Sequence, residues 1–355
     1  MKRRSFIKSV AAVLGLFTLG SSKSKASDTE YNWKMVTSWP KNFPGLGVGA
    51  ENLANLIMTL SNSRIKIKVY GAIELIPPLE VFDFVSQGGA EIGHSGAYYW
   101  KGKSPACQFF SSVPFGLTSQ EMNSWLYYGG GLELWEKLYQ NFNLIPRPAG
   151  NTGVQMGGWF NKEIKTISDL KGLKMRIPGL GGEVLSKVGG VPITLAGAEI
   201  FTALQTGAID ATEWVGPYND RAFGLHKVAK YYYYPGWHEP GPSIECIINK
   251  ESYTQLPQDL KIIIDTACKA INIDMLSDYS MKNMLALEFL KKNKIEIKEF
   301  PEEVLNVLRD TSNIVLKELS LSDDISMEIY NSYLDFRNKI TPWTEISNLS
   351  YLKTR

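Results

Sequence analysis

The sequence predicts an α/β fold made of two lobes around a cleft, followed by a helical appendage at the C-terminus. Three observations support this fold class: strand and helix patterns alternate over the first 250 residues or so, one short segment recurs, and three helical patterns follow Pro257. Alternating strands and helices favour a parallel sheet covered by helices. A length of 355 residues also suits about two domains.

The first lobe is predicted from a strand, a helix and a second strand. Residues 34–39 read as the first strand, and apolar residues in 53–60 follow with helical spacing. Apolar and charged residues then alternate over 65–69, which is typical of a half-buried strand. Pro77 and Pro78 open a short helix, because proline is accepted in the first turn.

The recurring segment begins with this short helix. Five residues of the first copy match five of the second at an offset of 119: Glu80, Phe82, Val85, Gly88 and Glu91 against Glu199, Phe201, Leu204, Gly207 and Asp210. Each copy reads as a helix ended by glycine, a turn and a strand. Aromatic and polar loops follow at 94–99 and 213–218. Ligands of open α/β sheets bind beyond the carboxyl ends of strands, so we expect these loops on opposite walls of one cleft.

The chain is expected to cross between the lobes around 153–160. A strand over 173–177 follows, and Pro178 and Gly179 stop it. Arg176 lies at the end of this strand, on its polar side. Composition alone leaves two roles open for this arginine, a solvated surface charge or a partner for an anion.

The C-terminal part is predicted to be helical, with one long stretch over about 257–293 and further helices from Pro301 and Asp323. The last helix has an apolar stripe made of Ile325, Ile329, Tyr333, Phe336 and Ile340. This stripe must be buried on the protein's own body or on a second copy. The expected organisation is a leader at 1–26, lobe 1 mainly at 27–150, lobe 2 mainly at 151–250 with crossovers between the lobes, and a helical region at 251–355.

Residues 1–26 are predicted to be a twin-arginine export signal. Arg3 and Arg4 precede an apolar run over about 10–20, and small residues at 24–26 suit cleavage. The run is shorter than the roughly 20 residues that span a bilayer. Without the six basic residues of this segment, the chain holds 32 basic against 36 acidic residues. We therefore expect a mildly acidic periplasmic protein that does not bind nucleic acid.

Enzyme motifs are absent from the sequence. It contains no Gly-x-Ser-x-Gly, His-Glu-x-x-His or Gly-x-x-x-x-Gly-Lys-Ser/Thr pattern, and only three histidines. Cys107, Cys246 and Cys268 lack the close spacing of a metal or redox pair, so we expect them to be buried and unpaired. The sequence therefore predicts that the protein is not an enzyme.

Turn-rich segments instead hold oxygen donors and one planar cation. The donors are Tyr98, Tyr99, Asn151, Gln155, Glu213 and Glu239, and the cation is Arg176. Two carboxylates with an amide and a main-chain carbonyl suit a hard cation such as Ca²⁺ or Na⁺. A guanidinium group suits a substrate carboxylate, which it binds through two parallel hydrogen bonds. Ordinary surface charges are the alternative interpretation of these acids.

Four motifs in order resemble the solute-binding subunits of TRAP transporters. They are QMGGWFNK at 155–162, DLKGLKMRIPG at 169–179, AIDATEW at 208–214 and GWHEPG at 236–241. The match covers nearly the whole chain after the leader and is nearest to the branch that binds 2-oxo or 2-hydroxy monocarboxylates with a metal ion. The resemblance implies a periplasmic binding protein fold that captures a small acid such as pyruvate or lactate. Separate membrane permease subunits would receive the acid.

The resemblance also implies residue roles. Arg176 would form the salt bridge to the substrate carboxylate. Gln155, Glu213, the main-chain oxygen of Trp214 and Glu239 would hold the Ca²⁺ or Na⁺. The substrate-contacting set would comprise Tyr98 or Tyr99, Asn151, Gln155, Arg176 and Trp214, with the choice between the tyrosines open. Related proteins exchange a C-terminal helix, which implies a homodimer with a candidate dimerisation helix at about 323–340.

Two other functions fit parts of the sequence. An exported periplasmic enzyme acting on an organic acid is the main alternative, because twin-arginine cargo often carries redox cofactors. No cofactor-ligating cluster is visible in the sequence, which argues against it. A soluble chemoreceptor adaptor would differ from a transport protein only in its downstream partner, and permease genes beside this one would favour transport.

Overall fold

The computed structural model describes residues 29–355, and the leader predicted for 1–26 lies outside the described residues. Residues Tyr31–Arg355 form one compact unit. Within 29–355, no helix combines the length and the apolar character needed to cross a membrane.

The first sheet contains the predicted N-terminal strands. Its order is β2 (Ile65–Tyr70), β1 (Tyr31–Thr37), β3 (Ile92–Ser95), β10 (Ser243–Asn249) and β4 (Leu144–Asn151). β1 pairs in parallel with β2 and β3, whereas β10 runs antiparallel to β3 and β4. The chain therefore returns to the first sheet with β10, late in the sequence.

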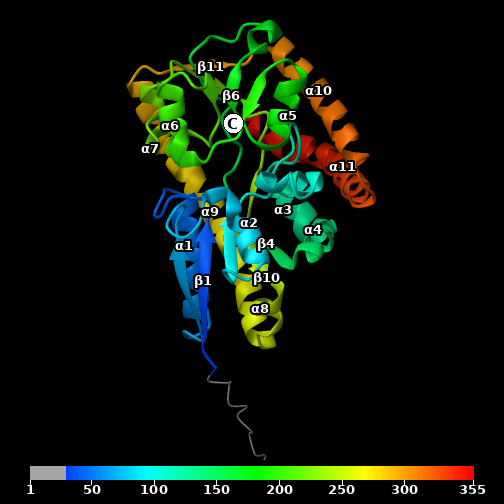
Figure 1. Cartoon of the computed structure of the whole chain (residues 1–355). Coiled ribbons are helices and arrows are strands. Elements are labelled where there is room, and N and C mark those ends of the chain that lie inside the picture. Colours follow the sequence, from blue (N-terminus) through cyan, green and yellow to red (C-terminus); the bar gives the residue numbers. More distant parts are fainter. Residues whose placement is uncertain (1–28) are drawn as a thin grey trace, which may run out of the picture. The chain divides into compact units, whose positions relative to one another are not determined.

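The second sheet is built from the middle of the chain. Its order is β11 (Glu296–Glu299), β9 (Tyr231–Tyr234), β5 (Gly158–Phe160), β8 (Ala211–Thr212), β6 (Lys174–Arg176) and β7 (Val191–Ile193). β6 pairs in parallel with β7 and β8. β4 ends at Asn151 in the first sheet and β5 begins at Gly158 in the second, so the chain passes from one sheet to the other over residues 152–157. Two sheets flanked by helices confirm the predicted fold class (Figure 1).

Helices cover both sheets and form the C-terminal region. Their bounds are α1 (Leu46–Leu60), α2 (Val81–Ser86), α3 (Ser119–Tyr128), α4 (Gly131–Tyr139), α5 (Gly179–Lys187), α6 (Gly197–Gln205), α7 (Pro217–Ala222), α8 (Lys250–Thr254), α9 (Gln258–Lys292), α10 (Glu302–Ser320), α11 (Asp324–Thr344) and α12 (Ser350–Leu352). α9 is one unbroken helix that contacts β4 of the first sheet and α7 beside the second. The short strand β11 interrupts the region expected to be helical, and no pattern in the sequence indicated it.

The recurring segment has the same local structure in both copies. α2 and α6 are each followed by a glycine in the left-handed region, Gly88 with φ 78° and Gly207 with φ 75°. β3 then enters the first sheet and β8 the second. The predicted helix, glycine, turn and strand are therefore confirmed, and the loops that follow the two strands belong to different lobes.

The C-terminal apolar stripe packs on the protein's own body. Asp323 caps the N-terminus of α11, and its side chain accepts a hydrogen bond from the Ser326 N–H at 2.7 Å. Tyr333 is buried, its hydroxyl accepts from the Leu117 N–H at 2.8 Å, and its ring lies 5.6 Å from that of Phe109. Exposed apolar side chains follow near the chain end, at Trp343, Ile346, Leu349, Tyr351 and Leu352. The stripe could be buried on the protein's own body or on a second copy, and in the structure it is buried on the protein's own body.

A buried carboxylate in the first lobe makes stability depend on pH. Glu245 in β10 is fully buried and accepts hydrogen bonds from Trp100 Nε1 and, at 2.9 Å, from the Tyr139 hydroxyl. Burial raises the pKa of Glu245 to about 7, against the opposing effect of these two hydrogen bonds. The unfolded chain has the ordinary, lower carboxyl pKa. The stability contributed by the protonated form is therefore present at low pH and is lost as the pH rises through about 7.

Glu245→Gln should flatten this pH dependence. The amide keeps both neighbours paired without a charge. As the pH rises from 5 to 8, the unfolding free energy of the wild type should therefore fall by about 2 kcal/mol relative to that of the variant. Urea denaturation at the two pH values measures the difference. Glu80→Gln, which removes an exposed carboxylate, is the matched control. Equal pH dependence of Glu245→Gln and the wild type would contradict the assignment.

Candidate functional site

The predicted site residues meet where two strands of the second sheet end. Arg176 is the last residue of β6, and Glu213 directly follows β8. The Glu213 N–H donates to the Arg176 carbonyl at 3.1 Å, so the sheet register places the two side chains together. Each side chain is 1% exposed, and the two form an ion pair. The interpretation of Arg176 as a solvated surface charge is therefore wrong.

The guanidinium group of Arg176 has a partner on every side. Nε donates to the Leu195 carbonyl at 3.2 Å, Nη1 donates to Glu213 Oε1, and Nη2 donates to the Tyr99 hydroxyl at 3.2 Å. The Trp214 ring lies 5.0 Å from the guanidinium carbon. Burial lowers the pKa of Arg176, but the Glu213 carboxylate raises it, and the net direction is upward. Arg176 is therefore a permanent positive charge inside the protein.

Gln155 and Glu239 complete a second layer beside this ion pair. Gln155 Nε2 donates to Glu239 Oε2 at 2.7 Å and to Thr152 Oγ1 at 3.2 Å. The Gln155 N–H also donates to the Glu239 carbonyl at 3.1 Å. Burial raises the pKa of Glu239 well above its usual range and Glu213 adds to this, whereas Arg176 and Gln155 act in the opposite direction. Two buried acids thus share one buried arginine.

Several buried polar atoms in this cluster have no hydrogen-bond partner among the described residues. They are Gln155 Oε1, Glu213 Oε2 and both ring nitrogens of His238. Glu213 Oε2 and His238 Nε2 lie 3.4 Å apart. Two unpaired acceptor oxygens in a region with an excess of acids fit a hard cation. Residues 29–355 contain no group of three or more His, Cys, Asp or Glu side chains placed for a metal, so such a site would need the amide and a carbonyl.

The structure distinguishes the two tyrosines. Both lie in the 3-10 helix η2 (Ala97–Trp100) after β3. Tyr99 reaches Arg176 through its hydroxyl, whereas the Tyr98 ring packs edge-on against Tyr99 at 4.5 Å and faces Gly179. The hydrogen bond from Arg176 to the Tyr99 hydroxyl therefore joins lobe 1 directly to the arginine of lobe 2. The pKa of each tyrosine is raised, mainly by burial, so both hydroxyls stay protonated.

Asn151 lies at the end of β4 and is fully buried, but its amide bonds to backbone groups. Its Oδ1 accepts from the Gly153 N–H at 2.9 Å, and its Nδ2 donates to the Gly241 carbonyl at 3.3 Å. Gly241 is the last residue of the motif that contains Glu239. The side chain therefore ties the interlobe crossover to the Glu239 loop, and the structure does not bring it onto Arg176.

Trp214 provides an apolar wall. Its ring packs against Trp39 at 6.3 Å, Phe43 at 6.2 Å and Phe223 at 5.1 Å, and Trp39 also lies 6.3 Å from Tyr99. Trp39 and Phe43 come from the first lobe, so aromatic rings of both lobes close around the polar cluster. The sequence left the role of His238 open and held no signal for Leu195 or Trp39, which contact the cluster only through the tertiary fold.

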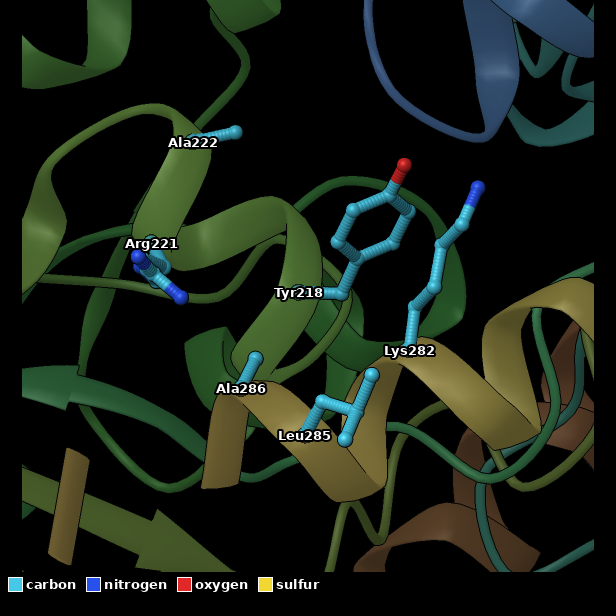
Figure 2. Close-up of a pocket in the computed structure, with 6 residues that line it drawn as sticks. All are labelled: Tyr218, Arg221, Ala222, Lys282, Leu285 and Ala286. Carbon is cyan, nitrogen blue, oxygen red and sulfur yellow. The ribbon is translucent and has the colours of Figure 1, made fainter. Parts of the chain in front are cut away.

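One open hollow on the surface contains none of the residues of this cluster. It has a volume of about 360 Å³ and is lined by Tyr218, Arg221 and Ala222 from α7 and by Lys282, Leu285 and Ala286 from α9 (Figure 2). None of these six residues was predicted as a site residue. The polar cluster is buried, and we therefore assign the functional centre from its unpaired atoms and charges.

The three described cysteines are free and buried, as the sequence predicted.

The fold and the site together define a two-lobed solute-binding protein. It has two α/β lobes linked by crossovers, with a buried arginine and unpaired oxygens where strands of both lobes end. The model of the family described as bacterial extracellular solute-binding protein, family 7 (DctP), matches residues 35–323. The chain belongs to this family, whose members are solute-binding receptors of TRAP transporters that act outside the cytoplasm. It is therefore not an enzyme.

Similar proteins cover almost the whole chain. A monocarboxylate 2-oxoacid-binding periplasmic protein of Nostoc sp. (strain PCC 7120) is 43% identical over 357 residues, covering 99% of this chain and 98% of the relative. A TRAP periplasmic solute-binding protein from Pseudoalteromonas atlantica, solved with bound sodium and pyruvate, has a TM-score of 0.90 and 41% identity. Another from Colwellia psychrerythraea, with calcium and pyruvate, has a TM-score of 0.90 and 42% identity. Both alignments cover 92% of this chain and 100% of the other.

Proposed function

We propose that this protein captures a small 2-oxo or 2-hydroxy monocarboxylic acid, such as pyruvate or lactate, with the help of a bound Ca²⁺ or Na⁺. The observation that carries the proposal is the buried Arg176 beside unpaired oxygens of Gln155 and Glu213. A buried guanidinium selects for a carboxylate, and the unpaired oxygens select for a cation. The named ligands of the Nostoc relative and of the two solved structures support the same class.

Binding would exchange the partners of the ion pair. Arg176 would release Glu213 and turn its planar donors to the carboxylate of the acid, while Tyr99 holds the guanidinium from the other lobe. Gln155, Glu213, Glu239 and the Trp214 carbonyl would hold the cation, which supplies positive charge to the remaining oxygens of the acid. With Ca²⁺, the charges of Arg176, the two acids and the ligand cancel. With Na⁺, they cancel if Glu239 keeps its proton, which its raised pKa favours.

The aromatic wall supports a small ligand. Trp214 lies beside Arg176, and Trp39 and Phe43 of the other lobe pack against the Trp214 ring. Filling space with rigid rings leaves room for a short apolar group and excludes a long one. Asn151 would then act by holding the Glu239 loop, and Tyr98 would act by packing against the Tyr99 ring.

Thermal unfolding of the mature protein tests the proposal. We expect the melting temperature to rise with pyruvate or lactate when Ca²⁺ or Na⁺ is present, and the rise with calcium to disappear after chelation. A ligand at 100 times its dissociation constant adds about 2.7 kcal/mol to the stability of the folded state. Adding back calcium or sodium alone distinguishes the two cations. No rise with any 2-oxo or 2-hydroxy acid, with both cations supplied, would contradict the proposal.

The partners and the export route belong to the same proposal. We propose twin-arginine export, on the pattern at residues 1–26, and delivery of the acid to TRAP permease subunits in the membrane. We also propose a homodimer. Because the stripe of α11 is used within the chain, the exposed apolar side chains from Trp343 to Leu352 are the better candidates for its interface. Sedimentation of the chain with and without residues 343–355 tests the dimer.

A further inference from the structure

Asp220 in α7 is a buried carboxylate that the function described above does not use. It is 1% exposed, and no lysine or arginine pairs with it among the ion pairs of residues 29–355. Four donors satisfy its oxygens. Oδ2 accepts from Trp159 Nε1 at 2.9 Å and from the Tyr232 hydroxyl at 2.7 Å, and Oδ1 accepts from the backbone of Val215 at 3.2 Å and Gly216 at 3.1 Å.

The backbone contacts of Asp220 reach the candidate cation site directly. The Val215 N–H and the Trp214 carbonyl belong to the same peptide unit, which is planar and trans. An N–H aimed at Asp220 therefore aims the Trp214 carbonyl in the opposite direction. A charged acceptor on the N–H also polarises the peptide and strengthens its carbonyl oxygen as a ligand.

The same carboxylate also fixes the other side of the site. Trp159 and Tyr232 stack at 4.0 Å and hold Asp220 to β5 and β9. The Val215 carbonyl accepts from the Met156 N–H at 3.0 Å, so the loop that Asp220 holds is joined to the residue after Gln155. Gln155, Glu213 and Trp214 thus depend on one loop, and Asp220 is the side chain that anchors it.

We propose that Asp220 is a positioning residue for the cation site, which orients and polarises the Trp214 carbonyl through the Val215 N–H. This inference rests on the proposed function. Groups that orient metal ligands from outside typically change metal affinity by about 10–100-fold when they are removed. A carboxylate that served only the fold of lobe 2 would change the stability without a specific effect on the cation.

The test compares Asp220→Asn and Tyr232→Phe with a matched control, Tyr233→Phe. Tyr233 is the next residue of β9, and its hydroxyl accepts from the Ile164 N–H at 2.8 Å and does not contact the loop. Calorimetry measures Ca²⁺ affinity in the presence of pyruvate. We expect the dissociation constant for Ca²⁺ to rise by about tenfold or more in Asp220→Asn, less in Tyr232→Phe and not in Tyr233→Phe. At saturating Ca²⁺, pyruvate affinity should return to the wild-type value.

A second measurement needs no cation. In the metal-free protein, amide hydrogen exchange at Val215 and Gly216 should be faster in Asp220→Asn than in the wild type and unchanged in Tyr233→Phe. Wild-type Ca²⁺ affinity in Asp220→Asn, or a loss of pyruvate binding that Ca²⁺ does not reverse, would overturn the inference. A wild-type protein whose acid binding depends on neither Ca²⁺ nor Na⁺ would overturn the proposed function and this inference with it.

Discussion

Arg176→Lys should weaken the binding of the acid by about 100-fold or more, because lysine keeps the charge but loses the planar pair of donors. The lysine ammonium would still neutralise the two neighbouring acids, so the fold should survive. Arg176→Ala is less informative, because removing one partner of a buried ion pair costs about 3–5 kcal/mol of stability. Calorimetric titration of the Lys variant with pyruvate, at saturating calcium, gives the affinity.

The matched control for this prediction is Arg147→Lys. Arg147 is also largely buried and pairs with Glu136 and Asp265, but it lies in the first lobe at β4. Its replacement should leave the affinity for pyruvate unchanged. Wild-type affinity in Arg176→Lys, or an equal loss in both variants, would contradict the role of Arg176 as the carboxylate partner.

Glu213→Gln should remove the dependence of acid binding on the cation. The substitution takes one charge from the cation ligands, so the Ca²⁺ affinity should fall by about 100-fold. It also releases Arg176 from its intramolecular partner, so the arginine is free to accept the acid without a cation. Melting temperatures with pyruvate should then be the same with calcium and with chelator, whereas those of the wild type differ.

Glu245→Gln is the control for Glu213→Gln, because it also neutralises a buried carboxylate but does so in the core of the first lobe. Its response to chelator should match that of the wild type. If Glu213→Gln keeps the full calcium-dependent shift, Glu213 is not a cation ligand and the ligand set needs another acid.

The fold was predictable because its signals are local. Alternation in 65–69, the glycines that end α2 and α6, and the proline or acidic residues that start α9, α10 and α11 each depend on neighbouring residues alone. β11 was missed for the same reason. Its four residues, Glu296–Glu299, become a strand only because β9 lies beside them and supplies the hydrogen bonds.

Part of the site could be predicted because residue chemistry is written in the sequence. The types and order of Gln155, Arg176, Glu213 and Glu239 indicated an anion partner and a hard cation, and the structure brings these four side chains together. The choice between Tyr98 and Tyr99 could not be made, since adjacent residues share every local signal and differ only in the direction of the side chain.

The sequence by itself determined the fold class, several of the elements and the chemical types at the site. Only the tertiary structure decided that Arg176 is buried, that Tyr99 is its partner and that Asp220 anchors the loop after Glu213. These properties depend on groups from β5, β9 and the opposite lobe, up to 77 residues away along the chain. Burial and hydrogen-bond partners are set by packing between distant segments, and no local pattern encodes which segments will meet.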